Sequence, residues 1–119
     1  MFRDVQIEAP TTDNSRAGRN IVAVIGIDRY RKWPRLNNAV NDARGALSAF
    51  LRLGFEQVSD PLYDEAATAD AIRSLVTDDL ATLNTDDSLV LFFAGHGHAS
   101  TQTFHEGDSV KTGYIIPVD

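Results

Sequence analysis

His96 is the residue whose type and setting best suit catalysis. It lies between Gly95 and Gly97, directly after the apolar run Leu89–Phe93. An imidazole carries protons near neutral pH, and flanking glycines let backbone and substrate approach it closely. The same pattern also describes a glycine-rich turn with an exposed histidine. The residues alone leave both interpretations open, although loops that follow strands often carry function.

Two carboxylates accompany this histidine as candidates for substrate binding. Asp28 directly follows the apolar run Asn20–Ile27, and Asp42 lies in the first turn of the helix expected next. A carboxylate in a cleft attracts a basic side chain through a charge-assisted hydrogen bond. The alternative for Asp28 is a turn-forming role, and for Asp42 a favourable position at the positive end of a helix.

Metal binding is the less favoured interpretation of the histidines. His96 and His98 would share a face in an extended chain, and His105 could complete a site. The chain has no cysteine, and no carboxylate that would orient these ligands can be identified. We therefore expect no metal and no cofactor. The lack of cysteine also excludes disulfides and a cysteine nucleophile among these 119 residues.

Two apolar runs predict the centre of the fold. Asn20–Ile27 and Leu89–Phe93 hardly alternate with polar residues, which is typical of neighbouring strands buried on both faces of a parallel sheet. Gln57–Tyr63 predicts a short strand, placed at the sheet edge because it contains a proline. Gly113–Val118 predicts a final strand, whereas the polar stretch Thr101–Lys111 predicts a loop.

Helical spacing of apolar residues links these strands. One helix is expected from Asn38 to a C-cap at Gly54, and a second from an N-cap at Thr68 to Leu83. Strands that alternate with helices predict an α/β fold with a mainly parallel sheet and functional residues beyond its carboxyl ends. We expect residues 1–19 to be a flexible leader or linker, and residues 20–119 to form the ordered domain.

Charge and hydropathy restrict the partners. The net charge of −6 argues against a broad surface for nucleic acid or an anionic membrane. The segment Arg29–Arg35 mixes bases with Tyr30 and Trp33 and could bind single-stranded nucleic acid, but we favour a partly packed loop beside the cleft. The chain has no apolar stretch of ~18 residues and its first residues lack a secretory core. We expect a cytoplasmic protein with neither nucleic-acid nor membrane partners.

Taken in order, several segments resemble the N-terminal part of a caspase-like cysteine peptidase domain of the prokaryotic and metacaspase kind. The order and spacing of these segments are specific, although each alone is common. They are AVIGIDRY (residues 23–30), LNNAVNDARGALSAFLRLGF (36–55), ATADAIRSLV (67–76), DDSLVLFFAGHG (86–97) and GYIIPVD (113–119).

This resemblance implies a three-layer α/β/α sandwich with a mainly parallel sheet, incomplete here at its C-terminal side. It implies a catalytic role for His96, the histidine of the GHG motif, and an oxyanion-binding backbone N–H at Gly97. The family's nucleophilic cysteine would lie downstream of this chain. We therefore expect a cysteine endopeptidase whose partners are a peptide or protein substrate and the downstream segment, with the present chain inactive alone.

The resemblance also implies a specificity. Asp42 matches the aspartate of the family's N-D-A segment, which belongs to the acidic primary pocket of metacaspases and favours cleavage after Arg or Lys. Asp28 is the second expected substrate-binding residue. The chain departs from the metacaspase pattern in having Asn38 and Ala39 where a cysteine commonly precedes the N-D pair. Arginines between residues 29 and 35 leave an acidic substrate, as in eukaryotic caspases, as the alternative.

Two further functions stay open. The chain could be a non-catalytic caspase-like module for interaction or regulation, and a downstream strand ending in D-x-C would decide against it. A receiver-like signalling domain with Asp28 or Asp64 as phospho-acceptor is less favoured, because the acidic cluster and lysine of such a site are not assembled. Nucleotide binding lacks its motif, since no G-x-G-x-x-G or G-K-[ST] is present.

Overall fold

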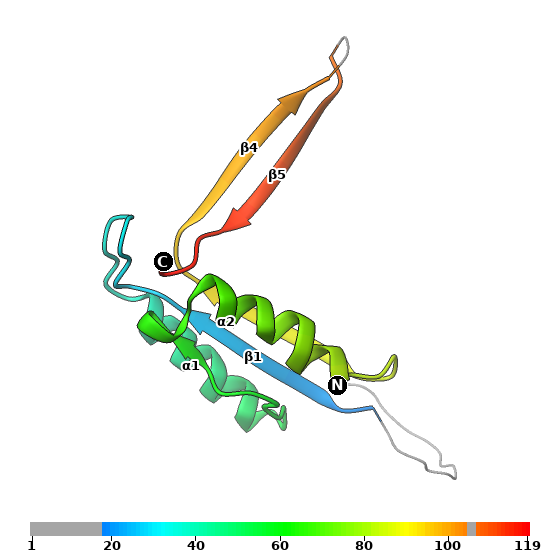
Figure 1. Cartoon of the computed structure of the whole chain (residues 1–119). Helices are drawn as coiled ribbons and strands as arrows, with labels where there is room; N and C mark the ends of the chain where they lie inside the picture. The colour runs from blue at the N-terminus through cyan, green and yellow to red at the C-terminus, as the bar shows by residue number, and fades with distance from the viewer. Residues whose placement is uncertain (1–17, 105–106) are drawn as a thin grey trace.

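The computed structural model describes residues 18–104 and 107–119 (Figure 1). The predicted leader therefore lies outside the described residues except for Gly18 and Arg19. The elements follow one another as β1 (Asn20–Gly26), α1 (Ala39–Arg52), β2 (Leu62–Tyr63), η1 (Asp64–Ala66), α2 (Ala69–Ser74), η2 (Leu75–Asp79), η3 (Leu80–Thr82), β3 (Ser88–Ala94), β4 (Gly97–Thr103) and β5 (Ser109–Ile115).

A parallel sheet with the order β2-β1-β3 forms the body of the molecule. β1 and β3 pair in parallel along their full length, from Asn20 opposite Ser88 to Gly26 opposite Ala94. Every residue from Ile21 to Ile27 is buried, so the first predicted strand and its neighbour are confirmed. The mixture of helices with a parallel sheet agrees with the predicted α/β class.

The helices pack on opposite sides of β1 (Figure 1). Val22 and Val24 belong to a cluster with Ala43 and other residues of α1. Ala23 and Ile25, which alternate with them, contact the segment that begins with α2. Both faces of the central strand are thus covered, which explains why its sequence is continuously apolar.

The expectation that Leu89–Phe93 is buried on both faces is wrong for the described chain. Leu89 and Leu91 are 41% and 42% exposed. β3 is an edge strand of the described sheet, and no described strand pairs with its outer edge. β3 therefore has more apolar surface than its neighbours in the described chain bury.

The helix boundaries follow local signals. α1 is followed by Gly54 with a φ of 95°, the left-handed conformation expected of a glycine after a helix. Thr68 caps α2 as predicted, and its Oγ1 accepts a hydrogen bond from the N–H of Ala71 at 3.1 Å. The second helix is less regular than its pattern predicts, because α2 widens into the π-helical turn η2 and then tightens into η3.

Two strand predictions need correction. β2 includes only Leu62–Tyr63 of the predicted segment Gln57–Tyr63, although its place at the sheet edge is confirmed. The predicted loop Thr101–Lys111 instead contributes to both strands of an antiparallel hairpin, β4–β5, and the predicted final strand Gly113–Val118 is confirmed only from Gly113 to Ile115. β-Branched residues stabilise such a ribbon even where its surface is polar, so polarity alone was a misleading sign of a loop.

The hairpin projects from the body (Figure 1). All residues of β5 and all but one of β4 are exposed. After β5 the chain returns to the body, where Val118 is buried. The N–H of Val118 donates to the carbonyl of Ala67, and its carbonyl accepts a hydrogen bond from the N–H of Arg31. Within the described residues, no helix is both long and apolar enough to cross a membrane.

Candidate active site

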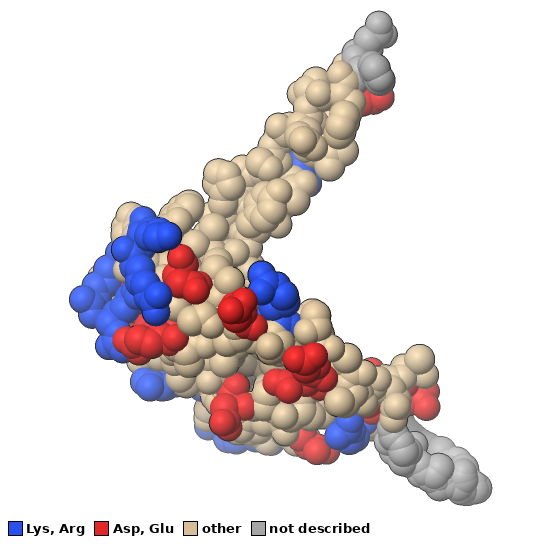
Figure 2. Space-filling model, in the orientation of Figure 1, with Lys and Arg blue, Asp and Glu red and all other residues tan. Residues whose placement is uncertain are grey.

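The carboxyl ends of β1 and β3 meet at one edge of the sheet. The N–H of Ile27 donates to the carbonyl of Ala94 at 3.0 Å, which fixes the two ends side by side. The loop of residues 28–38 leaves β1 there and carries exposed bases, which gather in one patch (Figure 2). Gly95 and His96 leave β3 at the same edge, as predicted for functional residues of a parallel sheet.

The His96 ring is held by this loop. Its Nε2 lies 2.7 Å from the carbonyl oxygen of Pro34. A carbonyl oxygen can only accept, so Nε2 carries the hydrogen in this contact and Nδ1 is left as the basic nitrogen of the neutral ring. The rings of Tyr30 and Trp33 pack against the imidazole at centroid distances of 4.8 and 5.4 Å. These contacts set both the orientation and the tautomer of His96.

Tyr30 positions the backbone around the histidine. Its hydroxyl accepts a hydrogen bond from the N–H of His96 at 2.8 Å and donates one to the carbonyl of Ile116 at 2.9 Å. Burial raises the pKa of Tyr30, and the His96 hydrogen bond offsets only part of this effect. A Cβ at Gly95 would lie 2.4 Å from the Tyr30 hydroxyl, so this packing requires a glycine.

The backbone N–H of Gly97 takes no part in the β4–β5 ladder. Gly97 lies opposite Ile115, and the N–H of Ile116 donates to the carbonyl of His96. In an antiparallel ladder this bond makes Gly97–Ile115 a non-hydrogen-bonded pair. The ladder therefore leaves the N–H of Gly97 unused, and Gly97 directly follows His96 in the sequence.

Asp42 lines a cavity of about 520 Å³ at this edge. The cavity wall also includes Arg35, Phe93 and Gly95, so Asp42 shares it with the residue that precedes His96. Asp42 is exposed and lies in the first turn of α1, where a carboxylate also favours the helix dipole. The cavity lining thus contains one acidic and one basic side chain, together with Asn37 and Asn38.

Asp28 lies at the N-terminus of α1. Its two carboxylate oxygens accept hydrogen bonds from the N–H groups of Ala39 and Val40 at 2.8 and 3.2 Å. These bonds replace the missing side-chain cap of Asn38 and fix the loop to the helix that carries Asp42. The substrate-binding role expected of Asp28 stays a prediction, while its observed contacts are those of a helix cap.

Asp64 is a site residue whose role the sequence did not indicate. Its carboxylate accepts hydrogen bonds from the N–H groups of Asp28 and Arg29 at 2.8 and 3.0 Å. Burial raises its pKa, but these two bonds and the Arg29 charge outweigh burial, so the pKa lies below its ordinary value. Its φ of 49° is a left-handed conformation that Asp tolerates better than most residues. Arg29 also pairs with Glu65 at 2.6 Å.

The remaining histidine of the motif belongs to an aromatic group rather than to a metal cluster. His98 stacks on Tyr114 across the hairpin and contacts Trp33 edge-on, both at 6.4 Å between centroids. Among the described residues, no group of three His, Cys, Asp or Glu side chains could hold a metal ion. His105, the third candidate ligand, lies outside the described residues.

Comparison with known proteins decides the family. A family model described as the caspase domain of the C14 peptidases matches residues 19–119. The chain belongs to the caspase domain family. The resemblance expected from the GHG motif and its neighbouring segments is thereby confirmed over nearly the whole chain. No curated protein and no solved structure matched it. Membership of this family indicates a cysteine-peptidase type of function and protein substrates in general.

Proposed function

We propose that this chain is the part of a caspase-like cysteine endopeptidase that carries the catalytic histidine, His96. The main support is the 2.7 Å contact between His96 Nε2 and the Pro34 carbonyl. It leaves Nδ1 as the nitrogen that can exchange a proton with a thiol. The chain has no cysteine, so the nucleophile must come from residues outside these 119.

The chemistry requires three groups. Nδ1 of His96 first takes the proton of the cysteine thiol. The resulting thiolate attacks the scissile carbonyl carbon, and a sulfur–carbon bond forms while negative charge moves to the carbonyl oxygen. The unused N–H of Gly97 is suited to donate to this oxygen. His96 then passes a proton from Nδ1 to the leaving amine as the carbon–nitrogen bond breaks. Water subsequently hydrolyses the thioester and restores the thiol.

The cavity beside Gly95 suggests cleavage after Arg or Lys. A basic substrate side chain placed there can form a charge-assisted hydrogen bond with Asp42. Arg35 lines the same cavity, and we propose that Asp42 rather than Arg35 binds the substrate side chain. The uncovered outer edge of β3 is the place where further strands of the family's α/β/α sandwich would add.

The test reads the coding sequence beyond residue 119 and, where it encodes a D-x-C segment, assays the extended chain with a fluorogenic arginine peptide. We expect cleavage that His96→Ala lowers by several orders of magnitude. Asp42→Ala should lower kcat/KM for an arginine peptide by at least about 100-fold, the effect of removing a charge-assisted contact. His98→Ala, a neighbouring histidine outside the proposed dyad, is the matched control and should cost much less.

The outcomes separate the alternatives. A reading frame without a cysteine after the next strand would favour a non-catalytic interaction module. Cleavage that survives His96→Ala would overturn the dyad. Unchanged kinetics of Asp42→Ala on arginine peptides would remove the specificity proposal alone. The 119-residue chain by itself should show no peptidase activity.

A further inference from the structure

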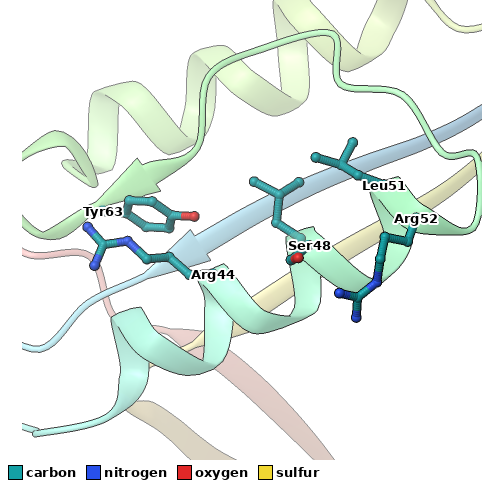
Figure 3. Close-up of a pocket in the computed structure, with 6 residues that line it drawn as sticks. Arg44, Ser48, Leu51, Arg52 and Tyr63 are labelled. Carbon is teal, nitrogen blue, oxygen red and sulfur yellow. The ribbon is translucent and has the colours of Figure 1, made fainter.

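A second cavity lies along α1, apart from the residues around His96. It has a volume of about 390 Å³ and a mainly apolar lining. Figure 3 shows that α1 supplies most of its wall, and Tyr63 of β2 the rest. Its lining residues are Arg44, Leu47, Ser48, Leu51, Arg52 and Tyr63. None of them lines the cavity that contains Asp42.

The two arginines of this α1 groove have no acidic partner among residues 18–104 and 107–119. Arg44 lies over the ring of Tyr63, with its Cζ 5.1 Å from the ring centroid, and forms no ion pair with an acid of the described residues. Arg52 forms none either in this part of the chain. By contrast, three other arginines each pair with a carboxylate: Arg19 with Asp87, Arg29 with Glu65 and Arg73 with Asp70. Arg44 and Arg52 thus both line the groove, and neither pairs with a carboxylate of the described residues.

The spacing along α1 defines the shape of a complementary partner. Arg44, Ser48 and Arg52 follow one another at four-residue intervals and form one ridge of the helix. The two arginines lie eight residues apart, or roughly 12 Å along the axis. Ser48 is small and leaves a notch between them. Leu51, 40% exposed, adds apolar surface beside that notch.

We propose that the α1 groove docks an acidic amphipathic helix of a partner protein. Two acids about two turns apart would pair with Arg44 and Arg52, and an apolar side chain between them would fill the notch at Ser48. Charge complementarity supports this choice, because the groove is basic on a chain with a net charge of −6. The apolar lining favours a peptide over a nucleic acid, whose phosphates would find only two cations here.

The test measures binding of a labelled peptide to the 119-residue chain by fluorescence anisotropy. The probe is a designed helical peptide of about 16 residues, with two glutamates eight residues apart and leucines between them. A second peptide has lysines in place of these glutamates. We expect the acidic peptide to bind and the lysine peptide not to bind.

Variants assign the binding to the groove. Arg44→Glu with Arg52→Glu should weaken binding of the acidic peptide by about tenfold or more, because two attractions become repulsions. Lys111→Glu changes an exposed charge in β5 by the same amount per residue and should have no effect. Leu51→Ala should weaken binding without a change of charge. Circular dichroism of each variant checks that α1 remains folded.

Each contrary result has a defined meaning. Equal loss on Lys111→Glu would show non-specific charge attraction and overturn the proposal. The same would follow from no binding of the acidic peptide, or from tighter binding of single-stranded DNA that depends on Arg44 and Arg52. His96→Ala should leave peptide binding unchanged, so the groove and the proposed peptidase function succeed or fail separately.

Discussion

The sheet body and the β4–β5 hairpin are built on different physical grounds. In β1 every residue from Ile21 onward is buried, whereas every residue of β5 is exposed. The central strand β1 is held by apolar packing on both faces. The hairpin relies on its backbone ladder and on cross-strand pairs, and an isolated two-stranded ribbon is only marginally stable in water. Stability in this domain is therefore unevenly distributed.

The candidate site lies where these two regions join. His96 is the last residue before β4, and its N–H and carbonyl bind Tyr30 and Ile116 at the base of the hairpin. The Tyr30 hydroxyl links both sides of that base. The orientation of His96 thus depends on a stable sheet on one side and a weakly supported ribbon on the other.

The largest expected effect separates core from hairpin. Ile25→Ala empties a fully buried site and should lower the free energy of unfolding by about 2–5 kcal/mol. Val110→Ala in β5, where the side chain is half exposed, should cost below about 0.5 kcal/mol. Urea denaturation followed by circular dichroism measures both. Similar losses for the two variants would contradict the contrast.

The next effect concerns the junction. Tyr30→Phe removes a hydroxyl that serves the His96 N–H and the Ile116 carbonyl, so unfolding should become easier by about 1–3 kcal/mol. Amide hydrogen exchange should accelerate in β4 and β5 but not in β1. Tyr114→Phe, which removes an exposed hydroxyl, is the control. Uniform acceleration across the chain would show that Tyr30 supports the whole fold instead.

The same division explains how much could be predicted from the sequence. Ile21–Ile27, Gly54 and Thr68 carry strong local signals, so the central strand, the end of α1 and the cap of α2 were predictable. The location of the site was predictable as well, because parallel strands bring Gly95 and His96 beside the loop after β1. The exposure of Leu89 and Leu91 in β3 was not predictable, because a continuous apolar run is typical of a strand buried on both faces.

The hairpin and the Asp64 contacts were not predictable for different reasons. Thr101, Thr103 and Thr112 are polar but β-branched, and only the pairing partner reveals whether such a segment forms a ribbon. Asp64 lies 36 residues from Asp28, and its role depends on the parallel placement of β2 beside β1. The local sequence around Asp64 does not predict that contact.

A smaller effect is expected at the body side of the junction. Asp28→Ala removes the acceptor of two N–H groups at the start of α1. It should lower the free energy of unfolding by about 1 kcal/mol. Asp42→Ala, in the same first turn but with no side-chain cap bond, should cost less. Thermal denaturation compares the two variants. Equal losses would show that the helix dipole, rather than the cap, determines the effect.

The smallest expected effect is a pH dependence at Asp64. Hydrogen bonds from the N–H groups of Arg29 and Asp28, with the Arg29 charge, outweigh burial and hold its pKa below the ordinary value of 3.8. A carboxylate with a lowered folded pKa stabilises the fold above its unfolded pKa, and this stability is lost as the pH falls through the folded pKa.

Asp64→Asn keeps a residue that tolerates the left-handed conformation and an oxygen acceptor, but it removes the charge. Urea denaturation from about pH 6 down to 3 should therefore show a steeper loss of stability below about pH 4 for the wild-type chain than for Asp64→Asn. Asp70→Asn, which changes an exposed acid that pairs with Arg73 one turn away, should reproduce the wild-type curve. Parallel curves for the wild type and Asp64→Asn would mean that the tie between β1 and β2 does not depend on the Asp64 charge.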